Sequence, residues 1–195
     1  MSQTTCELFE AGSVTSAALS DGAVTSAKLA AGAGGKILQV VQTYKTDTFS
    51  TSSNGSHDLL TRTITPVAAG SSFLLMGKLM VGNSGSQSSG FAFRWLLGTT
   101  HITAGSGVNP GDRNIGWSGS EEGISDSTYG QYQSYDFSSQ YIHTPTYTLG
   151  DTLTYKIGLE LLQANTFYLN RTAVDSFGGA FPRGTSNLTI MEIAG

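Results

Sequence analysis

The feature that most constrains this chain is a ten-residue repeat near its start. Residues 13–22 (SVTSAALSDG) are followed directly by residues 23–32 (AVTSAKLAAG), and the two copies share Val, Thr-Ser-Ala, Leu and Gly at matched positions. Internal repetition of this kind is typical of stacked or fibrous architectures. Each copy offers few large apolar side chains, which cannot offset a backbone ordering cost of roughly 1–2 kcal/mol per residue. The repeats therefore need partners.

A threefold assembly would supply these partners. Three chains wound together bring the large apolar residues of the repeats to a shared axis, and closed symmetry limits the assembly to a defined size. The alternative is a flexible Ala/Ser/Gly linker, but a linker has no reason to keep Val and Leu in register. We therefore expect a trimeric stalk over residues 13–35. Its axial residues are Val14, Leu19, Val24 and Leu29.

After the Gly-rich join at residues 31–35 the pattern changes to that of β-strands. In residues 152–160 apolar residues alternate with mainly polar ones, as in a half-buried strand. Residues 73–81 are apolar on both faces, as expected for a strand covered by a sheet and by a neighbouring subunit. About eight strands with Gly/Ser turns predict an all-β domain, an antiparallel β-sandwich of jelly-roll type, over residues 36–195. The other expected strands are residues 36–44, 59–65, 91–97, 132–143, 166–170 and 186–193.

The composition argues against several functional classes. Only 12% of residues are charged, the net charge is −4, and Lys and Arg form no cluster, so nucleic-acid binding is not expected. The longest apolar stretch, residues 73–76, is too short to span a membrane. A single cysteine, Cys6, permits no disulfide within one chain, and residues 1–10 lack the pattern of a signal peptide. We therefore expect synthesis in a reducing cytoplasm.

The residues that carry metal chemistry are scattered. The histidines have no spacing of a known metal site; they are His57, His101 and His143. Oxygen ligands for calcium exist at Asp112, Asn114 and Asp126, but their spacing is not that of a known calcium loop. We expect neither a metal nor another cofactor.

The carboxylates of residues 121–126 could suggest a glycan hydrolase. Such an enzyme needs two carboxylates at a controlled separation across a sugar-binding cleft. Here Glu121, Glu122 and Asp126 lie in one Gly/Ser-rich run, so solvated loop charge is the preferred interpretation. We expect no catalytic site.

The long segment at residues 98–130 is the candidate binding loop. Loops of this length are uncommon unless they are functional or disordered. Tyr, Trp, Ser and Gly are favoured in adaptable recognition loops, and an aromatic ring can stack on a sugar. The candidate receptor contacts are Trp117, Tyr129, Tyr132 and Tyr135. Alternatively, these aromatics pack against a neighbouring subunit or a capsid floor.

Several motifs resemble those of tail-fibre and other virion proteins of cyanophages and marine phages. The resemblance lies in the tandem Val-Thr-Ser-Ala-x-Leu-x-x-Gly units, the join GKILQVVQ and the ending SNLTIMEI. The segments FRWLLGTTHI and YLNR are also similar. Leu97 stands where a basic residue often occurs in that family, and residues 101–130 resemble none of its elements. These motifs are structural rather than catalytic, so the resemblance implies a structural protein of the virion, assembled in the cytoplasm of the bacterial host.

We therefore expect a short tail fibre whose β domain, the knob, contacts the host surface. Residues 1–12 are the expected virion anchor, with Leu8 and Phe9 as their large apolar side chains. The expected partners are further copies of the chain, other virion proteins and a host-surface glycan or protein. The alternatives are a capsid decoration, cement or head-fibre protein and a baseplate or tail component. A surface-glycan hydrolase is the least favoured hypothesis.

Overall fold

A computed structural model describes most of the β domain. The chain divides at Lys36, and Ile37–Gly195 forms one compact unit. The expected stalk residues Val14, Leu19, Val24 and Leu29 and the expected anchor residues Leu8 and Phe9 lie outside the described residues. The described residues are 20, 23, 36–82, 90–108, 111, 114–120, 130–162, 166–176, 181 and 183–195.

The secondary structure of the described residues consists of strands and two short 3-10 turns. This confirms the predicted all-β class, and every expected strand is present within a few residues of its predicted bounds. The strands are β1 (Ile37–Lys45), β2 (Phe49–Thr51), β3 (Gly55–Ile64), β4 (Ser72–Gly82), β5 (Phe91–Leu97), β6 (Thr100–His101), β7 (Ser118–Ser120), β8 (Ser134–His143), β9 (Leu153–Leu161), β10 (Phe167–Leu169) and β11 (Ser186–Ile193). The turns are η3 (Thr103–Gly105) and η4 (Gly130–Tyr132).

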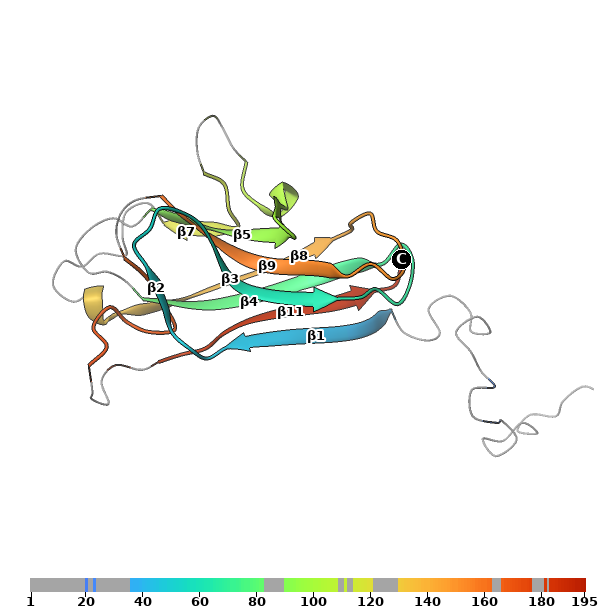
Figure 1. Ribbon diagram of the computed structural model, residues 1–195, viewed down its shortest axis with the longest axis horizontal. Coiled ribbons are helices and arrows are strands. Elements are labelled where there is room, and N and C mark those ends of the chain that lie inside the picture. Colours follow the sequence, from blue (N-terminus) through green and yellow to red (C-terminus); the bar gives the residue numbers. More distant parts are fainter. Residues whose placement is uncertain are drawn as a thin grey trace, which may run out of the picture. The chain divides into compact units, whose positions relative to one another are not determined.

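The strands form two antiparallel sheets (Figure 1). Sheet A has the order β1-β11-β4-β10-β2, and β8 also pairs with β4. Sheet B has the order β3-β9-β5-β6, and β7 also pairs with β5. The long-range pairs are nested along the chain, since β1 pairs with β11, β3 with β9, and β4 with β8.

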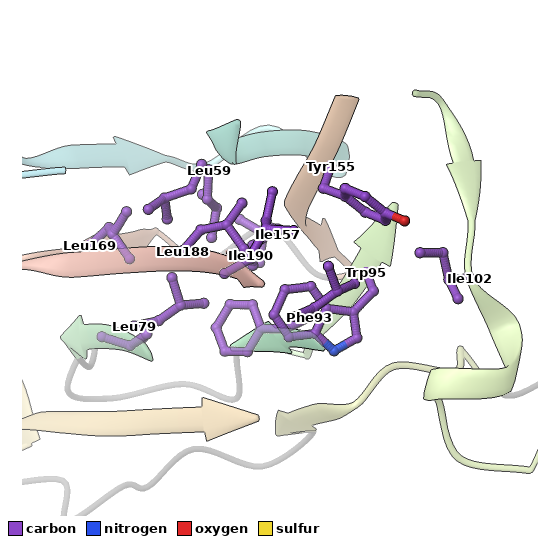
Figure 2. Close-up of a cluster of buried hydrophobic side chains, with 14 of the residues drawn as sticks. Leu59, Leu79, Phe93, Trp95, Ile102, Tyr155, Ile157, Leu169, Leu188 and Ile190 are labelled. Carbon is purple, nitrogen blue, oxygen red and sulfur yellow. The ribbon is translucent and has the colours of Figure 1, made fainter. Parts of the chain in front are cut away.

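The hydrophobic core lies between the inward faces of the two sheets (Figure 2). Alternation along each strand produces it: on β9, Tyr155 and Ile157 point into the core, while Lys156 between them is half-buried. The two sheets approach each other closely at Gly77 of β4. A Cβ atom added there would lie 2.6 Å from Cδ1 of Ile157 and 2.8 Å from Cη2 of Trp95. Glycine at this position therefore lets the two sheets approach closely.

A buried carboxylate fixes the loop between β3 and β4 to β11. Glu192 is inaccessible to solvent, and its oxygens accept hydrogen bonds from the backbone N–H groups of Val67 and Ala68 at 3.1 Å. The hydroxyl of Ser71 donates at 2.8 Å and the side-chain amide of Gln39 at 2.6 Å. Burial alone would raise the pKa of Glu192, but these donors outweigh burial and lower that pKa below its ordinary value.

Candidate functional site

A polar hollow of about 240 Å³ lies on the outer face of sheet B. Gly158 of β9 lines it, paired with Asp58 of β3 on one side and with Arg94 of β5 on the other, and Leu96 packs over this glycine. A Cβ atom at Gly158 would come within 2.4 Å of Cδ1 of Leu96. A glycine inside a strand often marks a position where another group approaches the backbone. We call this feature the sheet B hollow.

Two ion pairs line the sheet B hollow. Nη1 of Arg94 lies 2.9 Å from Oε2 of Glu160, and Nζ of Lys156 lies 2.6 Å from Oδ2 of Asp58. The hydroxyl of Ser56 also donates to Glu160. The two cations balance the two carboxylates, so these four side chains carry no net charge. Such a surface suits an uncharged ligand with many hydroxyl groups better than it suits an anion.

Arg94 also connects the hollow to the candidate binding loop. Its Nε donates to the carbonyl oxygen of Ile115 at 3.1 Å, and Nη2 donates to Oδ1 of Asn114 at 3.2 Å. All three nitrogens of the guanidinium group therefore have a partner, which fixes its orientation. Residues 114 and 115 of the loop are thus tied through Arg94 to the sheet that forms the floor of the hollow.

Two histidines border the sheet B hollow. The ring nitrogen Nε2 of His101 lies 2.8 Å from the hydroxyl of Ser106. Burial, and secondly the positive charge of Arg94, lower the pKa of His101, so its ring is neutral at neutral pH. Nε2–H of His57 donates to the carbonyl oxygen of Ser53 at 2.8 Å. Both rings therefore have fixed hydrogen-bond partners at the rim.

The hollow is better arranged for binding than for bond cleavage. Its two carboxylates, Asp58 and Glu160, are both paired with cations. Glycoside hydrolysis needs one carboxyl group that holds a proton and a second at a defined separation. The loop carboxylates Glu121, Glu122 and Asp126, and also Asp112, lie outside the described residues. Among the residues that are described, no group of three or more His, Cys, Asp or Glu side chains is placed to hold a metal.

One of the candidate receptor aromatics packs against the core. Trp117 is half-buried, with its ring 5.7 Å from that of Trp95 and 5.2 Å from that of Phe93. Its indole N–H is buried and has no hydrogen-bond partner among the described residues. This placement favours a packing role for Trp117 over a role as an exposed stacking platform.

Two tyrosines of the same candidate set, Tyr132 and Tyr135, are among the described residues. Tyr132 in η4 is 42% exposed, and its ring lies 5.7 Å from that of Phe181. Tyr135 is half-buried on β8 and donates its hydroxyl to Oε1 of Gln133 at 2.5 Å. Tyr129 lies outside the described residues. Tyr132 therefore retains an accessible ring face, and sequence reasoning on this set did not identify the sheet B hollow.

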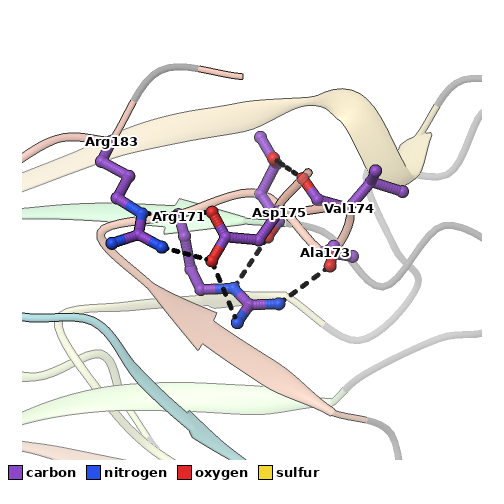
Figure 3. A network of polar contacts seen from close by, with 6 residues as sticks. Arg171, Ala173, Val174, Asp175 and Arg183 are labelled. Atoms are coloured by element: carbon purple, nitrogen blue, oxygen red, sulfur yellow. Dashed lines mark hydrogen bonds and ion pairs between the residues drawn. The ribbon is translucent and has the colours of Figure 1, made fainter. Parts of the chain in front are cut away.

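A second polar cluster surrounds Asp175 (Figure 3). Arg183 binds its carboxylate through two hydrogen bonds of 3.1 and 2.7 Å, and Nη1 of Arg171 lies 3.5 Å from Oδ2. Arg171 also donates to the carbonyl oxygens of Thr172 and Ala173. The hydrogen bond from Arg183 is the main reason that the pKa of Asp175 is lowered. These donors are engaged within the segment itself, so the cluster holds the chain between β10 and β11.

Comparison with known proteins assigns no family. No protein-family model matches this sequence, and no curated protein matches it. Within the part of the chain that is described, no helix has the length and apolar character needed to cross a membrane. The function is accordingly argued from the fold and from the sheet B hollow.

Proposed function

We propose that this chain is a structural protein of a bacteriophage virion, a short tail fibre whose trimeric knob contacts the host surface. The observation that carries the proposal is the nested strand order of the knob. Four strands in the order β1-β11-β4-β8 pack against four in the order β3-β9-β5-β6. This nested order supports a jelly roll for the knob, an architecture found in viral capsid and lectin domains.

Fold alone does not determine function, so the proposal also needs a site. The sheet B hollow supplies one: fixed donors and acceptors on rigid strands, without net charge on its four paired side chains. Its volume of about 240 Å³ lies below the roughly 300–1,000 Å³ of drug-sized ligand sites. It therefore suits a single sugar ring of a host-surface glycan.

Replacing the charges of one ion pair tests this role. We expect Asp58→Asn combined with Lys156→Gln to leave the knob folded but to reduce adsorption of particles to host cells at least tenfold. The matched control is Asp47→Asn with Lys45→Gln, because that exposed pair has the same 2.6 Å separation at the end of β1. Normal adsorption of the first variant would remove the sheet B hollow from the proposal.

A capsid decoration protein is the second candidate, and the inward packing of Trp117 favours it. A ring packed on Trp95 contributes to a rigid knob but not to receptor contact. Immunogold electron microscopy of intact particles separates the two candidates. Label at the tail supports the fibre, and label over the capsid supports decoration. If no particle carries the chain, both candidates are wrong.

A further inference from the structure

An apolar row crosses the outer face of sheet A. The strand register places Val40 of β1 opposite Met191 of β11, Met191 opposite Leu74 of β4, and Leu74 opposite Ile142 of β8. These four residues, one from each of four neighbouring strands, form what we call the apolar row. Leu38, two residues before Val40, lies at an irregularity in the pairing of β1 with β11 between Ile37 and Gln39.

The apolar row is accessible in the single chain. Ile142 is 56% exposed and Val40 51%, while Leu74 and Met191 are half-buried. The solvated face of an antiparallel sheet normally carries polar residues. A continuous apolar band on such a face marks an interaction surface.

The remainder of this face carries almost no free charge. The next row consists of Gln42, Thr189, Met76 and Gln140. The charged side chains at outward positions of β1, β4, β8 and β11 are Lys78 and Asp136, which pair at 3.0 Å. A face that is neutral in itself can pack on a copy of itself without like-charge repulsion.

The same face is hollowed beside the apolar row. An open depression of about 700 Å³ is lined by Gln42, Met76, Gln140 and Thr189, among others. Interfaces with threefold symmetry bring different parts of a surface together, so a protruding group on one copy needs a recess on the next. The exposed Ile142 and the depression lie on one face and meet that need.

We propose that copies of this chain pack through the outer face of sheet A around a threefold axis. The path of the chain from the repeats into β1 favours another copy of the same chain as the partner on this face. β1 begins at Ile37, after the repeats and the Gly-rich join at residues 31–35, so three associated repeats would bring three β1 strands near one another. Val40, near the start of β1, is then among the first knob residues to approach another copy. The packing does not depend on what the knob binds.

The test uses the full chain with Val40→Glu and Ile142→Glu as separate variants. Both positions are exposed in the single chain, so neither substitution should destabilise the fold of the single chain. The thermal unfolding midpoint of each monomeric variant should therefore match that of the monomeric wild type. Val108→Glu is the matched control, because Val108 is 92% exposed and lies in the loop after η3. Multi-angle light scattering should give three times the 20.4 kDa chain mass for wild type and control. Trimers of Val40→Glu and Ile142→Glu should dissociate to monomers at protein concentrations at least tenfold higher than those at which wild type and control dissociate.

A second measurement covers the case in which the repeats alone hold three chains together. The rates at which peroxide oxidises Met76 and Met191 report directly on cover over this face. We expect slow oxidation in wild type and Val108→Glu, and several-fold faster oxidation in Val40→Glu and Ile142→Glu at unchanged mass. A monomeric wild type would overturn the proposal. So would a trimer in which both methionines oxidise equally fast in all four proteins.

Discussion

The indole ring of Trp117 stacks on the indole ring of Trp95, with centroids 5.7 Å apart and planes inclined by 28°. Trp95 is fully buried on β5, and Trp117 directly precedes β7. The backbone N–H of Trp117 also donates to the carbonyl oxygen of Phe93 at 2.8 Å. The ring pair therefore attaches the part of the 98–130 segment that precedes β7 to the core.

Removing this ring should reduce stability. We expect Trp117→Ala to lower the free energy of unfolding by about 2–3 kcal/mol, somewhat less than for a fully buried tryptophan. Tyr132→Ala, at a more exposed ring, should lower it by at most about 1 kcal/mol. Equilibrium urea unfolding measures both. Equal losses in the two variants would contradict the packing role of Trp117.

A methyl group at Gly77, where the two sheets approach closely, should also be costly. Gly77→Ala places a Cβ atom against Ile157 and Trp95 of the opposite sheet, so we expect a loss of about 1–3 kcal/mol from overpacking. Gly107→Ala is the control, because its Cβ would meet nothing nearer than 3.9 Å. Thermal unfolding of both variants is the measurement. A Gly77→Ala protein as stable as Gly107→Ala would mean that the sheets can separate at this point without cost.

Acid should destabilise the knob through Glu192. Its folded-state pKa lies below the ordinary 4.5, so the unfolded chain takes up the proton first as the pH falls. The contribution of Glu192 is therefore complete above about pH 4.5 and is lost as the pH falls through the folded-state pKa. Unfolding midpoints measured between pH 7 and pH 3 should show this loss.

Glu192→Gln separates this effect from general acid sensitivity. The amide would direct its own N–H groups toward donors such as Ser71 and Gln39, so we expect a loss of about 1–3 kcal/mol at pH 7. The loss between pH 4.5 and pH 3 should become smaller in this variant. Asp136→Asn, at an exposed ion pair, should keep the acid response of the wild type. An unchanged acid response in Glu192→Gln would assign it to other groups.

Alternation of apolar and polar residues predicted β9, and burial confirms the pattern. β11 follows it as far as Ile190, beyond which Met191 lies on the outer face and Glu192 is buried. The longest strand, β4, was predicted from its continuous apolar run instead. The short strands β2, β6 and β7 were not predicted, whereas β10, which is also three residues long, was. Ser118–Ser120 is a strand only because it pairs with β5, so partners rather than propensity define it. The jelly-roll order and the trimer remain predictions that the strand pairing and the apolar row support.

The sheet B hollow was beyond sequence reasoning because its members look like ordinary solvated strand residues. Arg94 and Glu160 are 66 positions apart, and only the register of β5 and β9 brings them together. The one available signal was Gly158 in the middle of a strongly alternating strand. The aromatic loop attracted attention instead, because composition does not distinguish a ring that packs inward, such as Trp117, from one that faces solvent.

The pairing of β1 with β11 determines when the knob can form. The hydrogen-bonded residues Gln39 and Glu192 are 153 positions apart, so a ribosome adding about 5–20 residues per second delivers the second strand on the order of ten seconds after the first. Such non-local pairing also makes folding intrinsically slow. During this interval β1 is an unpaired strand edge on a nascent chain. Copies can therefore meet through a complete sheet A only once β11 has been synthesised.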